Sequence, residues 1–95
     1  MFEWDETKRI STIEKHSIDF IDAAEIFLQD HLLVSARSDI EDRKIAVGPL
    51  NGVFLAVIHT RRDDVIRIIT ARRARKDERE QFEAYVARRT PGEEG

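Results

Sequence analysis

The spacing of apolar and polar residues changes several times along the chain, and each change predicts a different element. Residues 2–4 read as a short extended segment with two aromatic side chains on one side. Asp5 fits a helix N-cap, because its carboxylate can accept hydrogen bonds from the free backbone N–H groups of the next turn. We expect the following helix to run to about Lys15. Ile10 and Ile13 would form the edge of this helix that faces the protein interior.

A second and clearer helical pattern begins at Asp19, the expected N-cap, with Asp22 three residues later as a carboxylate variant of the capping box. The spacing i, i+3, i+4, i+7, i+8 places five apolar side chains on one helix face. These are Phe20, Ala23, Ala24, Phe27 and Leu28. We expect this helix to pack flat against the rest of the fold.

Short apolar runs between polar turns predict four strands in the middle of the chain. They are Leu32–Val34, Ile45–Val47, Val53–Thr60 and Val65–Ala71. The turn over Gly48–Gly52 contains Asn-Gly, the strongest short hairpin signal, and the polar segment Arg61–Asp64 predicts a second turn. Short connections of this kind favour an antiparallel meander.

A final helix is expected from about Lys76 to Arg89, with an apolar stripe of Phe82, Tyr85 and Val86 and an end set by residues 90–92. The order is therefore α-α-β-β-β-β-α with a possible extra N-terminal strand. Helices segregated from a meander predict an α+β fold. We expect one domain over residues 1–90 and a frayed tail over 91–95.

Composition excludes several classes of protein. The 95 residues allow one small core, and the lack of Cys excludes disulfides and thiolate metal sites. The longest apolar run, Val53–Ile58, is too short for a membrane helix, and the N-terminal residues do not form a signal peptide. We expect a small soluble cytoplasmic protein with no membrane association.

Charge is distributed unevenly along the chain. Residues 1–42 hold 11 acidic and 4 basic side chains, whereas residues 43–95 hold 8 acidic and 12 basic ones. The basic excess is concentrated between Arg61 and Arg79. Such a stretch would attract a polyanion, but a solvated helix face with intrahelical ion pairs has the same composition.

Neither a metal nor a bound nucleotide cofactor is predicted. The three histidines, His16, His31 and His59, are not spaced at i, i+3 or i+4, and the four glycines form no phosphate-binding loop. We therefore expect chemistry without a cofactor.

Two basic features stand out. Arg67 lies within an otherwise apolar strand, where a charge is costly unless it is paired or faces a groove. The position of Arg67 therefore allows two interpretations. Its side chain either forms an ion pair, with Asp63, Asp64 or a helix carboxylate, or points into an anion-binding cleft.

The second feature is residues 72–79, which bridge the end of a strand and the start of a helix. Arg75 stands where an N-cap residue is expected, so the helix start lacks a good cap. Clustered cations there favour a bound phosphate or acidic partner, which a helix N-terminus attracts, although a solvated basic collar remains an alternative.

Two motifs in the chain resemble BrnT-type toxins. The N-terminal motif comprises Phe2-Glu3-Trp4-Asp5, Lys8-Arg9, Lys15-His16, Ile18, Phe20 and Ala23-Ala24. The C-terminal motif comprises Thr60, residues 67–74 and Glu78-Arg79. Family members usually carry Asn, Gly and Thr at the positions of Thr12, Ser17 and Arg75.

This resemblance implies a RelE-like fold and the toxin of a bacterial type II toxin–antitoxin system. The toxin would be an endoribonuclease that inhibits translation. It would be neutralised by a BrnA-type antitoxin of ribbon-helix-helix fold, and operator DNA would be bound indirectly, through that antitoxin.

RNA cleavage without a metal needs cations on the phosphate, a base for the 2′-hydroxyl and an acid for the leaving oxygen. We expect Arg67, Arg72 and Arg79 to contact the phosphate and Glu78 to act as general base, unless it only pairs with an arginine. His16 and His59 are lesser acid–base candidates. Further substrate-binding residues are expected at Arg62, Arg73, Arg75 and Lys76.

A different class of function is also compatible with the sequence. The chain could be a catalytically inactive interaction module that acts as co-repressor with a DNA-binding partner. Its acidic and basic halves would then be docking faces.

Overall fold

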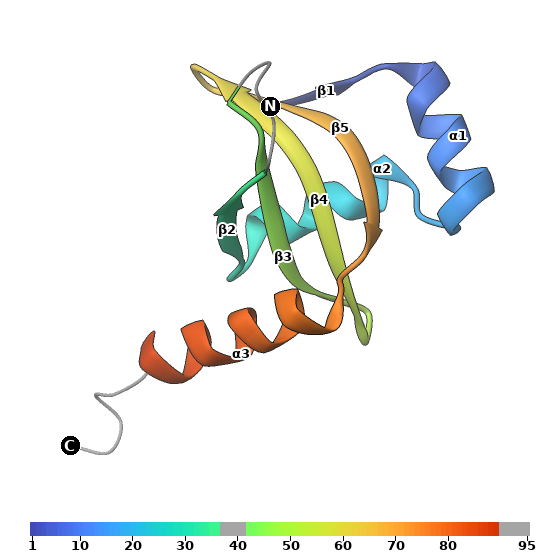
Figure 1. Cartoon of the computed structure of the whole chain (residues 1–95). Coiled ribbons are helices and arrows are strands. Elements are labelled where there is room, and N and C mark those ends of the chain that lie inside the picture. Colours follow the sequence, from blue (N-terminus) through green and yellow to red (C-terminus); the bar gives the residue numbers. More distant parts are fainter. Residues whose placement is uncertain (37–41, 90–95) are drawn as a thin grey trace.

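Five strands form one mixed sheet; two consecutive short helices lie across one face, and the C-terminal helix lies at one end of the sheet (Figure 1). The computed structural model describes residues 1–36 and 42–89, so the predicted helix-stop residues 90–92 and the tail 91–95 lie outside it. The elements in chain order are β1 (Phe2–Trp4), α1 (Glu6–His16), α2 (Phe20–Ala23), the 3₁₀ helix η1 (Ala24–Leu28), β2 (Leu32–Ser35), β3 (Lys44–Leu50), β4 (Val53–Arg62), β5 (Val65–Arg73) and α3 (Lys76–Arg89).

The strand order is β1-β5-β4-β3-β2. The predicted meander is confirmed for β2 to β5, which pair antiparallel. The possible extra N-terminal strand is confirmed as β1, which pairs parallel to β5, so the sheet has five strands rather than four. Since β1 and β5 are separated by most of the chain, no local signal could reveal this pairing.

A bulge in β5 decides which side chains share a face. Ile68 pairs with His59 and Thr70 with Ile58, so Ile69 is an extra residue between them. One extra residue shifts the alternation of side chains by one position. Arg67 and Arg72, five positions apart, therefore lie on the same face of the sheet.

We call this the arginine face, and its members on the two central strands are Phe54, Ala56, Ile58, Thr60, Arg67, Thr70 and Arg72. The N-terminal half of α3 covers one end of it, where the Phe82 ring lies 5.6 Å from the ring of Phe54 at an interplanar angle of 70°. The predicted bounds of α3 are confirmed, and so is the burial of Phe82, while Tyr85 and Val86 are half-buried.

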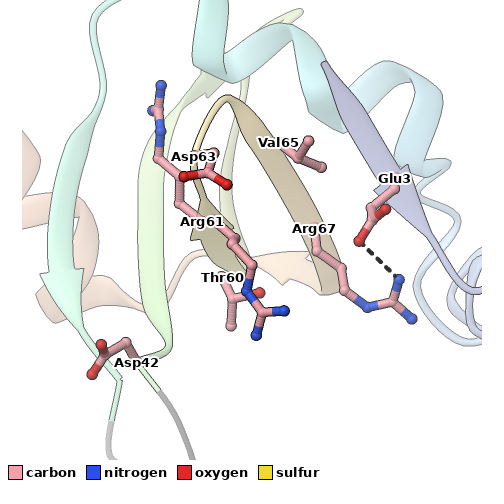
Figure 2. A pocket seen from close by; sticks show the side chains of 8 residues that line it. Glu3, Asp42, Thr60, Arg61, Asp63, Val65 and Arg67 are labelled. Carbon is pink, nitrogen blue, oxygen red and sulfur yellow. Dashed lines mark hydrogen bonds and ion pairs between the residues drawn. The ribbon is translucent and has the colours of Figure 1, made fainter.

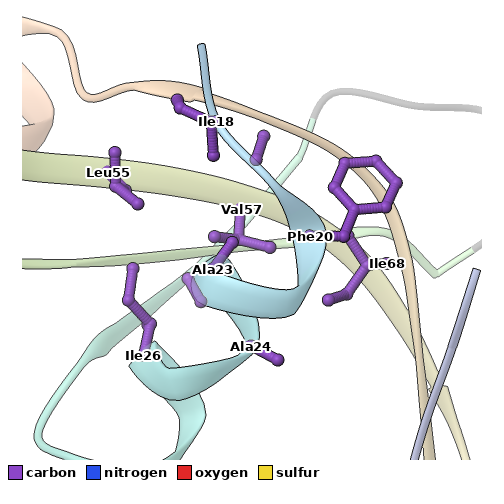
Figure 3. Close-up of a cluster of buried hydrophobic side chains, with 10 residues drawn as sticks. Ile18, Phe20, Ala23, Ala24, Ile26, Leu55, Val57 and Ile68 are labelled. Atoms are coloured by element: carbon purple, nitrogen blue, oxygen red, sulfur yellow. The ribbon is translucent and has the colours of Figure 1, made fainter. Parts of the chain in front are cut away.

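The opposite face carries the main hydrophobic core (Figure 3). Side chains of α2 and η1 pack there against Leu55, Val57 and Ile68 of the sheet. Phe20 and Ile26 are fully buried, and the Trp4 ring meets that of Phe20 edge-on at 6.1 Å.

The second helix departs from the prediction. Its N-cap is confirmed, because the Asp19 side chain accepts from the backbone N–H of Ile21, but α-helical geometry ends at Ala23. In a 3₁₀ helix side chains three apart share a face, so Ile26 follows Ala23 into the core. The predicted fifth member of the apolar face, Leu28, is instead 78% exposed.

The first helix begins as predicted, because the Asp5 carboxylate accepts from the backbone N–H of Thr7 at 2.8 Å. Its inner edge was predicted wrongly. Ile10 and Ile13 are 48% and 36% exposed, and the buried side chain of α1 is Thr12. The helix contacts β5, and it does so on the side that carries Thr12 rather than through its apolar residues.

The hairpin turns are tighter than predicted. Asn51 and Gly52 alone form the β3–β4 turn, with φ of 52° and 82°. Two residues with positive φ are the requirement of a type I′ turn, which matches the twist of the flanking strands. Gly48–Leu50 therefore continue β3, and β4 and β5 extend to Arg62 and Arg73 around a turn at Asp63 and Asp64.

None of the helices within residues 1–36 and 42–89 is long and apolar enough to cross a membrane.

The end of α1 supplies a test of local strain. Ser17 adopts the left-handed conformation, with φ of 59° and ψ of 33°, and its N–H donates to the Ile13 carbonyl at 2.9 Å. Glycine takes this conformation without steric cost. We expect Ser17→Gly to raise the free energy of unfolding by about 0.5–1 kcal/mol, or a few degrees in Tm.

Thermal melts check this expectation. As a control, Ser11→Gly places glycine inside α1 and should lower stability by about 1 kcal/mol. A Ser17→Gly variant that melts below the wild type would contradict the left-handed cap.

Candidate functional site

A bidentate ion pair joins the end of β5 to the first turn of α3. The Arg72 guanidinium donates from both terminal nitrogens to the two Glu78 carboxylate oxygens, each at 2.8 Å. The Glu78 side chain is 9% exposed and that of Arg72 is 22% exposed. A bidentate pair with so little access to water holds both side chains in one geometry.

Glu78 also caps the helix. Its Oε1 accepts from the backbone N–H of Arg75 at 2.8 Å, and the Arg75 carbonyl accepts the first intrahelical hydrogen bond, from Arg79. This is the reciprocal half of a capping box, in which the third helical residue satisfies the N-cap amide. The expected lack of a cap at Arg75 is therefore corrected, since Glu78 supplies the cap.

These contacts determine the protonation state of the pair. The hydrogen bonds from Arg72 and, less, from the Arg75 amide lower the pKa of Glu78 below its usual range, although burial opposes the shift. The same carboxylate raises the pKa of Arg72. A carboxylate that is ionised, buried and bonded on both oxygens has little capacity to take a proton from a substrate, so the geometry favours the pairing alternative over the general-base role.

Arg79 is held differently. Its guanidinium carbon lies 4.7 Å from the centre of the Phe54 ring, and its Nε lies 3.4 Å from a Glu83 oxygen. The Arg79 side chain is 57% exposed. Stacking on an aromatic ring orients the guanidinium while leaving donors free, so Arg79 can contact an anion over the arginine face.

Arg75 and Lys76 flank this pair at the start of α3, and both side chains are exposed. Neither forms an ion pair with another residue of the described chain. Together with Arg79 they leave three accessible cations around the helix N-terminus, where the helix dipole also favours an anion.

The predicted site residues Arg62 and Arg67 lie elsewhere, in a cleft of about 850 Å³ (Figure 2). Arg67 is exposed rather than buried, and its Nη1 donates to Glu3 of β1 at 3.2 Å. The ion pair predicted for Arg67 is confirmed, but the predicted partners are wrong. Glu3 comes close to Arg67 only because β1 pairs parallel to β5.

Opposite charges balance in this cleft. Arg61, Arg62 and Arg67 line it together with Glu3, Asp42 and Asp63. A phosphate would meet as many carboxylates as guanidinium groups. The start of α3 is therefore the better place for a polyanion.

The two histidines predicted as lesser acid–base groups are also separated from this site. His59 is 3% exposed on the core side, its Nδ1 lies 3.2 Å from the Val57 carbonyl, and burial lowers its pKa. His16 and the predicted substrate-binding Arg73 line a small depression on the face opposite Arg72. The structure thus brings together Arg72, Arg75, Lys76, Glu78 and Arg79 and separates Arg62, Arg67, Arg73, His16 and His59 from them.

Sequence reasoning missed Phe54, which orients Arg79, and Arg61, which lines the cleft. Phe54 follows the hairpin turn in an apolar run, so nothing local distinguished it from a core residue. Within residues 1–36 and 42–89 no three His, Asp or Glu side chains converge as a group that could hold a metal ion.

Comparisons with known proteins agree on one family. The model of the family described as "Ribonuclease toxin, BrnT, of type II toxin-antitoxin system" matches residues 4–78. The crystal structure of the Brucella abortus ribonuclease toxin BrnT superposes with a TM-score of 0.65 at 34% sequence identity, over 80% of this chain and 99% of that one. No curated protein sequence matches the chain.

The Arg72–Glu78 pair leads to a prediction about acid stability. Glu78→Gln keeps the shape but removes the charge, so we expect unfolding to cost about 2 kcal/mol less at pH 7. Because the folded-state pKa of Glu78 is lowered, its stabilisation is complete above the ordinary value of 4.5 and is lost as the pH falls through the folded value. The gap between wild type and variant should therefore shrink below about pH 4.5.

Denaturant titrations at pH 7, 4.5 and 3 measure this gap. Glu80→Gln, at an exposed position of the same helix, should change stability by less than about 0.5 kcal/mol. A gap that stays constant with pH would show that the Glu78 charge does not stabilise the fold.

Proposed function

The chain belongs to the BrnT family of ribonuclease toxins of type II toxin–antitoxin systems, and on that premise we propose that it is a metal-independent endoribonuclease whose centre lies at the junction of β5 and α3. The observation that carries the proposal is the gathering of Arg72, Arg75 and Arg79 around the start of α3. Cations on an exposed face match the charge that develops on a phosphate during RNA cleavage.

The chemistry follows from the groups present. The substrate's 2′-hydroxyl attacks the adjacent phosphorus, the bond to the 5′-oxygen breaks, and a 2′,3′-cyclic phosphate and a 5′-hydroxyl form. Arg79, with free donors, stabilises the pentavalent phosphate, and Arg75 and Lys76 hold the neighbouring strand. With Glu78 engaged by Arg72, water takes the proton from the 2′-hydroxyl and a second water molecule gives a proton to the leaving 5′-oxygen. Most of the rate then comes from positioning and charge.

Arg72 and Glu78 have a combined role in this proposal. The Nη atoms of Arg72 are bonded to Glu78, and the pair holds α3 at a fixed angle to β5. Arg72 adds positive charge beside the phosphate, while Glu78 positions Arg72 and the helix start. Arg62 and Arg67 contact flanking nucleotides from the cleft. Arg67 must first leave Glu3, and this costs little because exposed ion pairs are weak.

The family also implies the partners. The chain would inhibit translation in the bacterial cytoplasm by cutting RNA, and a small ribbon-helix-helix antitoxin would neutralise it. Operator DNA would be bound through that antitoxin. Growth arrest on expression of the chain alone, relieved by co-expression of the neighbouring antitoxin gene, tests this part of the proposal against an inactive co-repressor.

Arg79 offers the cleanest test of the centre. Arg79→Ala loses only a stacking contact with Phe54 and an exposed pair with Glu83, so the fold should remain intact. The lost transition-state contact should cost about 2–4 kcal/mol, or roughly 30- to 1000-fold in single-turnover cleavage. Arg79→Lys keeps the charge without the planar fork and should recover part of the rate.

Arg88→Ala, near the far end of the same helix, is the matched control and should cleave like the wild type. Arg72→Ala is less informative, because it leaves the buried Glu78 carboxylate unpaired and destabilises the protein. A folded Arg79→Ala variant with wild-type cleavage would remove Arg79 from the site.

Metal independence is tested directly. Purified protein should cleave single-stranded RNA at the same rate in EDTA as in magnesium, because the proposed charge stabilisation comes from guanidinium groups. Activity abolished by EDTA and restored by magnesium would overturn this mechanism.

A further inference from the structure

A second concave site lies across β5 from the proposed centre. It is a depression of about 160 Å³ between the end of α1, the start of α2, the β3–β4 hairpin and the end of β5. Leu50, Val53 and Leu55 contribute apolar walls, and the polar side chains at its edge are His16, Asp19, Asp22 and Arg73. This volume is well below the roughly 300 Å³ at which pockets for drug-sized ligands begin, so it suits a single ring system.

One of the polar groups is already engaged. The Asp19 carboxylate accepts from Arg9 at 2.8 and 3.0 Å and from the Ile21 amide at 3.0 Å, and these bonds lower its pKa. Asp19 therefore forms part of the wall and holds α1 against the start of α2.

The remaining polar groups are available. The side chains of His16, Asp22 and Arg73 form no hydrogen bond or ion pair with any other residue of the described chain. Asp22 and Arg73 carry opposite charges and line the same depression, yet they do not pair with each other. All three residues are exposed to solvent. The site thus offers a carboxylate acceptor, a guanidinium donor and an imidazole ring around apolar walls.

We propose that this pocket binds one guanine base of the RNA and so influences where the strand is cut, an inference that rests on the proposed ribonuclease function. Guanine carries acceptors O6 and N7 on one edge, which match a guanidinium such as that of Arg73. Its adjacent N1–H and N2–H₂ donors match the two oxygens of a carboxylate such as Asp22. An imidazole such as that of His16 can stack on a base.

The other bases fit this donor set less well. Adenine and cytosine present one amino group next to an acceptor on the Watson–Crick edge, and uracil presents a single N–H between two carbonyls. Each of these bases offers the carboxylate a single N–H on that edge, so only one of its two oxygens is satisfied, and the lost hydrogen bond costs binding free energy relative to guanine. A pocket with an arginine and a carboxylate together therefore favours guanine.

The location is compatible with the proposed centre. Arg72 and Arg73 are consecutive in β5, and their side chains lie on opposite faces of the sheet. A strand whose phosphate lies at the start of α3 could pass around this end of the sheet. A base near the scissile bond would then enter the pocket.

Nucleotide binding tests the pocket without reference to activity. In NMR titrations with the four nucleoside 5′-monophosphates, GMP should bind more tightly than AMP, CMP and UMP and shift the amides around His16, Asp22 and Arg73. Asp22→Asn should weaken GMP binding roughly 5- to 150-fold, the discrimination expected of one bidentate pair. Glu25→Gln, an exposed carboxylate outside the pocket, is the control and should bind GMP like the wild type.

Mapping cut sites on a mixed-sequence RNA links the pocket to specificity. Wild-type cuts should lie at a fixed distance from a guanine, and this preference should weaken in Asp22→Asn and in Arg73→Gln. Equal binding of all four nucleotides, or shifts confined to other residues, would overturn the pocket. If GMP binds as expected but the wild type cleaves no RNA, the pocket stands as a guanine site and the proposed ribonuclease function fails.

Discussion

The rest of this structure depends on the hydrogen bonds that the Glu78 carboxylate accepts. This carboxylate joins the side chain of Arg72, at the end of the last strand, to the backbone amide of Arg75, at the start of the last helix. Its two oxygens thereby fix the angle at which α3 leaves the sheet. The stacking of Arg79 on Phe54 and the packing of Phe82 depend on that angle. One residue is thus a helix cap, an ion-pair partner and a support for the neighbouring cations.

The bulge at Ile69 has a comparable effect on function. Because it shifts the alternation of β5, Arg67 and Arg72 share the arginine face, whereas Arg73 lies with the depression beside α1 and α2. Strand alternation divides the basic run between two surfaces, and the bulge decides which of them Arg67 shares. One surface holds the phosphate in the proposed function, and the other carries the pocket proposed for a base.

Long-range ion pairs neutralise part of the uneven charge distribution along the chain. The acidic N-terminal half and the basic C-terminal half contact each other through Glu3–Arg67 at 3.2 Å and Asp30–Arg89 at 2.9 Å. Both pairs are substantially exposed, so each contributes little stability. Their effect is to neutralise part of the basic half, which leaves the start of α3 as the place where accessible cations are concentrated.

The sequence by itself determined the family, the α+β class, the N-caps Asp5 and Asp19, and the bounds of α3, because capping and helical periodicity are local properties. Only the tertiary structure decided the parallel pairing of β1, the partner of Arg67 and the cap at Glu78, because these need residues brought together by the sheet. The same holds for the site. The basic residues were identifiable from their sequence positions, and strand alternation separates Arg72 from Arg73. The placement of Arg67 on the same face as Arg72, however, depends on a single bulged residue that no composition or spacing reveals.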